Sequence, residues 1–166
     1  MQDEAGRSSG ADVPALFNQS AQAYQNALEV FTKDNFSQYW AGGQMALASI
    51  CLDTSHFDTC VEQFGQISDG LLVPRQELRE DALRFLCAWG AGNKSAARET
   101  ERTLLSGAAD LTPYYWDATA TVSLLSNSSA FATDHTSWIA FFNSFHSGDS
   151  AGMTTALHQL EPLLQQ

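Results

Sequence analysis

The choice of aliphatic residues is the feature that most constrains what this chain can fold into. Val and Ile together number 8, whereas Leu and Ala together number 41. Helices favour Ala and Leu and strands favour β-branched residues, because a branched Cβ loses rotamer freedom against the preceding helical turn. The sequence therefore predicts an all-α protein.

Apolar residues at helical spacing, bounded by Gly, Pro, Asn and Asp, divide the chain into about eight helices. We expect these helices at residues 14–32, 36–52, 56–68, 75–90, 94–106, 113–126, 134–147 and 150–165. In the sixth helix, Thr112 is the expected N-cap and Pro113 the first helical residue. The connections are short, so neighbouring helices should be antiparallel and stack as hairpins. Residues 14–166 are predicted to form a single all-helical domain, behind a flexible polar leader at residues 1–13.

Two of the expected helix ends resemble one another at an offset of 56 residues. The matching positions are Phe85, Leu86, Trp89 and Gly92 in the first copy and Phe141, Phe142, Phe145 and Gly148 in the second. Each copy ends a helix in an aromatic residue before a Gly-Asn or Gly-Asp turn. This outline is similar to the helical hairpins of tetratricopeptide-type repeat proteins, although that family's Trp, Leu-Gly and Tyr signature is missing. The resemblance implies a TPR-like α-solenoid, and the alternative is an irregular helical bundle.

The charge balance excludes several classes of partner. The chain has 8 Lys and Arg against 19 Asp and Glu, a formal net charge of −11. Nucleic acids and anionic membranes are bound through cationic side chains, so neither is an expected partner. No stretch is long and apolar enough to predict a transmembrane span. Residues 1–12 have no apolar core of a signal peptide, so we expect either a cytoplasmic protein or a mature protein of the bacterial periplasm, such as a lipoprotein.

The positive charges are concentrated in the middle of the chain, whereas residues 103–166 contain no Lys or Arg. Arg75 and Arg79 are spaced for one helix face, and so are Arg98 and Arg102 on the next helix. We predict that these four residues form a ridge that receives an acidic partner, or the acidic half of a second copy in a homodimer. The alternative is a solvated face in which Arg and Glu residues pair along each helix.

Consecutive aromatic residues are the second candidate binding feature. Tyr114, Tyr115 and Trp116 cannot all face one core, because neighbours on a helix are about 100° apart. At least one of the three rings should therefore reach the surface. Tyr39 and Trp40 form a similar group. Exposed aromatic residues are typical of protein-binding hot spots, and the alternative is additional core packing.

The three cysteines are Cys51, Cys60 and Cys87. Cys51 and Cys60 lie on opposite sides of an expected tight turn between helices, so we predict a disulfide between them in an oxidising compartment, and Cys87 as inert core. The alternative is three buried thiols. No close cysteine pair suggests a metal site, and no hydrolase, phosphate-loop or dinucleotide motif is present. The sequence therefore predicts no metal, no cofactor and no enzymatic activity.

These observations favour a non-enzymatic protein-binding module, an adaptor or a chaperone-like accessory protein. It would hold a partner protein or peptide in a groove between helices, as a secretion-associated chaperone or a periplasmic lipoprotein would. One alternative is an immunity or inhibitor protein, in which residues 103–166 cover the basic site of a toxin or hydrolase. Another is a small helical enzyme in which His and carboxyl groups meet in a pocket.

Overall fold

A computed structural model describes residues 13–67 and 71–165 of the chain. In these residues there are eight α-helices, two short 3-10 helices and no strand, which confirms the all-α prediction. The α-helices are α2 (Val13–Val30), α3 (Ser37–Asp53), α4 (Phe57–Gln66), α5 (Pro74–Gly90), α6 (Lys94–Gly107), α7 (Thr119–Asn127), α8 (His135–Ser147) and α9 (Ser150–Gln165). The 3-10 helices are η1 (Ala108–Asp110) and η2 (Ser129–Asp134). The predicted leader lies outside the described residues, except that Val13 already belongs to α2.

Several helix ends are fixed by the residues that the sequence places there. The side chain of Asn93 accepts the backbone N–H of Ala96 at the start of α6, and Asp134 accepts that of Ser137 in the first turn of α8. Such caps satisfy N–H groups that have no partner within the helix. At the end of α8, Gly148 adopts a left-handed φ of 77°. Glycine suits this turn for two reasons. It adopts a positive φ without a steric penalty, and a Cβ at this position would lie only 2.6 Å from the nitrogen of Pro113.

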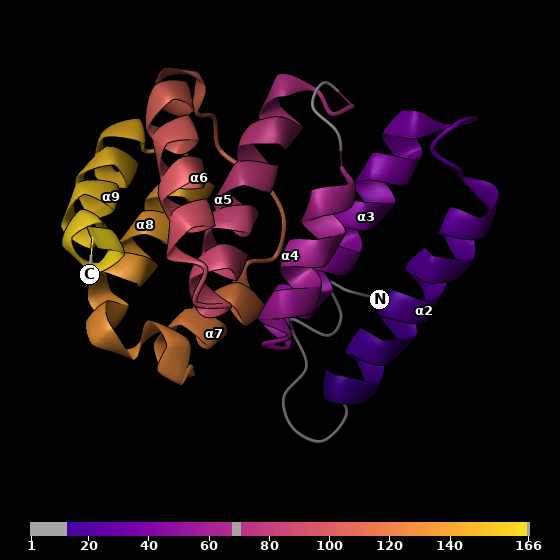
Figure 1. Cartoon of the computed structure of the whole chain (residues 1–166), viewed down its shortest axis with the longest axis horizontal. Helices are drawn as coiled ribbons and strands as arrows, with labels where there is room; N and C mark the ends of the chain where they lie inside the picture. The colour runs from indigo at the N-terminus through magenta and orange to yellow at the C-terminus, as the bar shows by residue number, and fades with distance from the viewer. Residues whose placement is uncertain (1–12, 68–70, 166) are drawn as a thin grey trace.

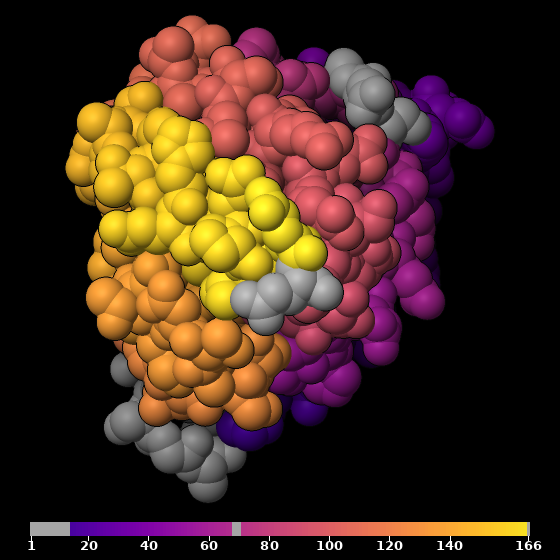
Figure 2. Space-filling model, turned by 60° about the vertical axis from the view of Figure 1, so that its left-hand side comes forward, coloured from indigo at the N-terminus to yellow at the C-terminus, as the bar shows by residue number. Residues whose placement is uncertain are grey.

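The helices follow one another along the molecule in nearly the order of the sequence. Figure 1 shows α2 at one end, then α3, α4, α5 and α6, with α8 and α9 at the opposite end and α7 crossing below. In Figure 2, α9 lies on the surface between α8 and α6. The arrangement is a helical bundle, and the TPR-like solenoid that the sequence suggested is not confirmed.

The main hydrophobic core runs from α3 to α9, and α2 is attached to it separately. The largest side chains without exposed surface are aromatic: Trp138, Phe64, Phe85, Phe131, Phe141, Phe142 and Phe145. The N-terminal helix instead joins a smaller cluster, in which Phe17 of α2 packs near Ile50 of α3. The end helix therefore has less apolar surface holding it in place than the helices at the opposite end.

The helix expected at residues 113–126 begins late, at Thr119, so that part of the prediction is wrong. Backbone groups of the preceding segment find partners outside any helix of their own. The N–H of Tyr114 donates to the carbonyl of His146 at 2.9 Å, and Arg75 donates to the carbonyl of Pro113. The Nε2 atom of His146 lies 2.9 Å from the carbonyl of Trp116. These contacts replace the hydrogen bonds that a helix would supply, so the segment crosses between α5 and α8 without one.

The predicted Cys51–Cys60 disulfide is also wrong. Cys60 of α4 is bonded to Cys87 of α5, with their Cα atoms 5.9 Å apart, and Cys51 is a free thiol. Cys60 and Cys87 are fully buried between two packed helices, whereas Cys51 is only half-buried. Burial raises the pKa of the Cys51 thiol. The tight turn brings the two backbones together, but side-chain direction decides which sulfurs meet. The prediction that Cys87 is inert core is therefore replaced by a structural cross-link.

Candidate functional site

The structure brings two of the predicted binding groups together. Arg75 and Arg79 project from α5 onto the aromatic residues of the crossing segment. The guanidinium carbon of Arg75 lies 5.0 Å from the ring centre of Tyr114 and 5.9 Å from that of Tyr115, and Arg79 lies 4.2 Å from that of Trp116. These are cation–π distances. The two arginines therefore help to hold the segment against α5.

Only one of the three consecutive aromatic residues reaches fully into solvent. Tyr115 is 90% exposed, whereas Tyr114 is buried and Trp116 is half-buried. The hydroxyl of Tyr114 donates to the carbonyl of Arg75 at 2.6 Å, and burial raises its pKa. This confirms that the three rings do not share one core. It makes Tyr115 the member of the group with a free face.

The other predicted arginines lie apart from this cluster, on α6. Arg98 and Arg102 are exposed, and the Nε atom of Arg98 donates back to the carbonyl of Lys94. A role of these arginines in binding an acidic partner stays a prediction. Arg84 forms an ion pair with Glu80 one turn earlier on α5, as expected for Arg and Glu residues that pair along a helix.

Tyr39 and Trp40, also predicted as partner anchors, point in different directions. Tyr39 is 69% exposed and stacks on Phe31, with ring centres 5.5 Å apart. Trp40 packs against the main core, and the ammonium group of Lys33 lies 5.2 Å from its ring centre. Phe36 packs edge-on against Phe31 and is exposed as well. The surface aromatic group is therefore Phe31, Phe36 and Tyr39, where α2 turns into α3.

A groove of about 550 Å³ begins at this aromatic group. It lies between α2, α3 and the start of α5, and is lined by Tyr24, Ala27, Leu28, Phe31, Gln38, Tyr39, Gly42, Gly43, Val73 and Gln76. None of these side chains is charged. A Cβ added at Gly42 would have no atom within 4 Å, so the groove is open above this residue. The arrangement can receive apolar side chains from outside the molecule.

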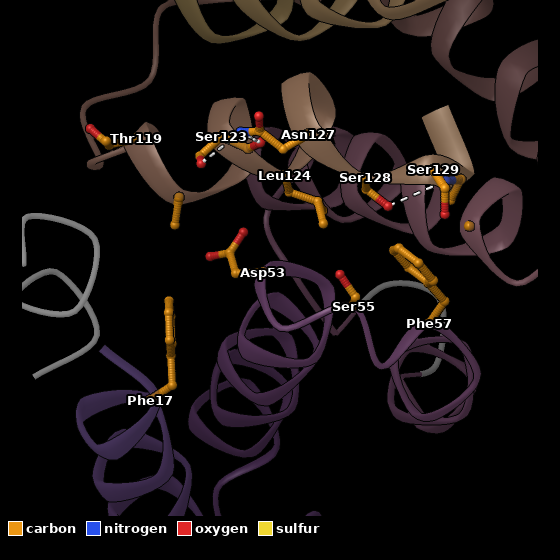
Figure 3. Close-up of a pocket in the computed structure, with 13 residues that line it drawn as sticks. Phe17, Asp53, Ser55, Phe57, Thr119, Ser123, Leu124, Asn127, Ser128 and Ser129 are labelled. Carbon is orange, nitrogen blue, oxygen red and sulfur yellow. Dashed lines mark hydrogen bonds between the residues drawn. The ribbon is translucent and has the colours of Figure 1, made fainter. Parts of the chain in front are cut away.

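A larger cavity of about 890 Å³ lies on another part of the molecule, where the ends of several helices meet (Figure 3). Its apolar walls include Phe17 of α2, Phe57 of α4 and Leu124 of α7. Its polar lining consists of Asp53, Ser55, Thr119, Ser123, Asn127, Ser128 and Ser129. In Figure 3 the carboxyl group of Asp53 points from the end of α3 into the space below α7.

Asp53 is the one carboxyl group among the described residues of this lining. Burial raises its pKa to about 7, although a hydrogen bond from Thr121 and the charge of Arg79 both act to lower it. The hydroxyl of Thr121 donates to Oδ1 of Asp53 at 2.8 Å. Near neutral pH this carboxyl group is therefore present in both protonation states, and it can donate or accept a hydrogen bond. No histidine stands beside it in the described lining.

The cavity was not predicted as a site. Neither Asp53 nor Phe17 was among the predicted binding residues. A weak signal was present in residues 119–129, in which hydroxyl and amide side chains are unusually dense. Such residues are also common in turns and at helix ends, so the pattern alone did not indicate a cavity.

Among the described residues, no group of three or more His, Cys, Asp or Glu side chains is placed to hold a metal ion. None of the helices in the described ranges has the length and apolar character needed to cross a bilayer. Comparison with protein-family models, curated proteins and solved structures gave no match. The tetratricopeptide resemblance is thus not supported by a family match.

Proposed function

We propose that this protein is a non-enzymatic protein-binding module, of the adaptor or chaperone-like kind, and that its docking site is the groove between α2, α3 and the start of α5. The observation that supports this most directly is the exposed aromatic group at the end of the groove. The ring of Phe31 contacts those of Phe36 and Tyr39, and all three residues are exposed in part. Clustered exposed aromatic residues beside a groove are typical of protein-binding surfaces.

The proposed occupant is an apolar, uncharged segment of a different protein. The lining has no charged side chain, so a charged segment would lose hydration without gaining a partner. A second copy of this chain is a poorer occupant, because each copy carries a net charge of −11 and like charges oppose association. The same net charge favours a partner protein that is basic outside the bound segment.

The Cys60–Cys87 bond bears on where such a module would work. Disulfides persist in oxidising compartments and are rare in the cytosol. This cross-link is consistent with a role outside the cytoplasm, such as the bacterial periplasm, and it fixes α4 to α5 beside the groove-forming helices. We therefore place the proposed module in an oxidising compartment.

Filling the groove from within tests this proposal. Leu at Gly42 is a good helix residue and enters open space, so Gly42→Leu should fold normally and block the groove. Gly65 of α4 offers a matched control, because a Cβ there would also meet no atom within 4 Å and Gly65 does not line the groove. Peptides would be selected on the wild-type protein from a phage-displayed random library, and their affinities measured by fluorescence anisotropy.

We expect apolar, uncharged peptides that bind the wild type and Gly65→Leu equally and bind Gly42→Leu at least about tenfold more weakly. Tyr39→Ser should also weaken the binding of these peptides. If no apolar peptide is enriched, or if Gly42→Leu binds the selected peptides as well as Gly65→Leu does, the groove is not the docking site.

A further inference from the structure

The cavity beside Asp53 is open to solvent and has the size of a small-molecule site. Its volume of about 890 Å³ falls within the range of about 300–1,000 Å³ that is typical of ligand pockets. Its lining comes from α2, α3, α4, α5, α7 and η2 and from the turn between α3 and α4, so several elements rather than one long loop position it. It shares no lining residue with the groove between α2, α3 and α5.

The lining is rich in neutral groups that both donate and accept hydrogen bonds. Hydroxyl groups come from Ser55, Thr119, Ser123, Ser128 and Ser129, and an amide from Asn127. No Lys, Arg or His belongs to the described lining, so a phosphate or carboxylate ligand would find no cation there. The lining instead matches a ligand that carries several hydroxyl groups of its own.

Part of this polar lining is still available to a ligand. The hydroxyl groups of Ser55 and Ser129 make no hydrogen bond to the protein within the described part of the chain. The amide nitrogen of Asn127 donates to the carbonyl of Ser123 at 2.8 Å, which leaves its oxygen for a donor from outside. The Asp53 carboxyl group lies between these groups and the ring of Phe17 (Figure 3).

Ser55 adds an independent observation. It is the only residue other than glycine with a positive φ in the described part of the chain, at 63°. The N–H of Ser55 donates to the carbonyl of Leu52, and the N–H of His56 donates to that of Cys51. This pair of hydrogen bonds is typical of a helix end at which glycine is the usual residue. A serine is more costly there than a glycine. Ser55 therefore carries a hydroxyl group at a position where the backbone favours glycine, and this residue lines the cavity.

We propose that this cavity binds a neutral polyhydroxylated ligand, a mono- or disaccharide, through the carboxyl group of Asp53 and the surrounding hydroxyl and amide groups. The rings of Phe17 and Phe57 supply apolar walls for the C–H faces of the sugar. This function is separate from the docking of a protein segment in the groove.

The test is an NMR titration of the ¹⁵N-labelled protein. The neutral probes are glucose, galactose, mannose, maltose and cellobiose, and the charged probes are glucosamine and glucose 6-phosphate. We expect at least one neutral sugar to shift the amide signals of residues 53–57 and 119–130 at millimolar concentration, with glucose 6-phosphate causing no such shift. If none of the neutral sugars shifts these signals, or if glucosamine binds more tightly than every neutral sugar, the proposal is overturned.

Matched variants locate the binding. Ser123 and Ser126 are both exposed on α7, but only Ser123 lines the cavity, so Ser123→Phe should abolish the shifts and Ser126→Phe should keep them. Asp53→Asn should weaken binding about tenfold. Ser55→Gly should raise the melting temperature and weaken sugar binding, because it relieves the turn and removes one hydroxyl. Equal affinity of Ser123→Phe and Ser126→Phe would place the sugar elsewhere and contradict the proposal.

Discussion

Two aromatic groups at opposite ends of the molecule have similar composition and different surroundings. In α8, Trp138, Phe141 and Phe142 have no exposed surface. Where α2 turns into α3, Phe31 and Tyr39 stack on one another and remain exposed. The rings of α8 are covered by other elements, as the ring of Phe85 from α5 shows, with its centre 5.3 Å from that of Trp138. The α2–α3 turn lies at the end of the row of helices, and no further helix of residues 13–67 and 71–165 lies beyond it (Figure 1).

Position in the bundle, more than residue type, therefore decides whether an aromatic group becomes core or surface. Each interior helix packs between neighbours on both sides, whereas α2 packs mainly against α3. Its apolar residues at the turn therefore have one covered side and one free side. The free side is the groove that we propose as a docking site.

Truncating one ring in each region should give the largest contrast. Phe142→Ala removes a fully buried ring and leaves a cavity, so we expect it to lower the free energy of unfolding by about 3–5 kcal/mol. Tyr39→Ala removes a ring that is mostly in water, and should cost less than about 1 kcal/mol. Urea unfolding followed by circular dichroism measures both. Equal losses for the two variants would show that the α2–α3 aromatic group is core and would remove the basis for a docking surface.

Breaking the disulfide that joins α4 to α5, between the two regions in the row of helices, should have the next largest effect. Cys60 and Cys87 join α4 to α5 across 27 residues, so replacing both with Ala should lower the free energy of unfolding by about 3 kcal/mol. Cys51→Ala serves as the control, and it should cost much less because this thiol is half-buried and unbonded. Thiol titration of the native protein should find one free cysteine. Three free thiols, or a double variant as stable as the control, would contradict the cross-link.

Much of the fold could be predicted from the sequence because its cues are local. Helical spacing and end residues such as Asn93 and Asp134 act within a few positions, so seven of the eight helices begin and end close to where they were expected. The exception is the helix that starts at Thr119. Its start is displaced by hydrogen bonds from Arg75 and to His146, which lie far from it in the sequence.

The sites could be predicted only in part, for the same reason. The sequence indicated an aromatic group at Tyr114–Trp116 and an arginine pair at Arg75 and Arg79. That these two groups contact one another depends on how α5 packs against the crossing segment, which no local pattern shows. The correct partner of Cys60 depends on which side of α4 faces α5. The cavity is made from the ends of helices that are far apart in the sequence, so its residues share no local pattern.

The smallest of these effects concerns Asp53, whose hydrogen bond to Thr121 joins α3 of the N-terminal region to α7 near the other end. The folded protein raises the pKa of this carboxyl group to about 7, and an unfolded Asp has a pKa of about 3.9. Between these values the folded state holds a proton that the unfolded state has released. Stability from this group is therefore full below about pH 4 and is lost as the pH rises towards 7.

Asp53→Asn removes this dependence, because an amide does not titrate. We expect the variant to gain about 2 kcal/mol of stability relative to the wild type between about pH 4 and pH 7. This gain is smaller than the full pKa shift implies, because the carboxyl group still faces an open cavity. Thr121→Val should move the loss to higher pH, since the hydrogen bond it removes acts to lower the pKa of Asp53. Urea unfolding of the three proteins across this pH range measures the differences. A constant difference between Asp53→Asn and the wild type, or one of opposite sign, would mean that Asp53 is hydrated like a surface carboxylate and that the two regions meet in water rather than in a shared site.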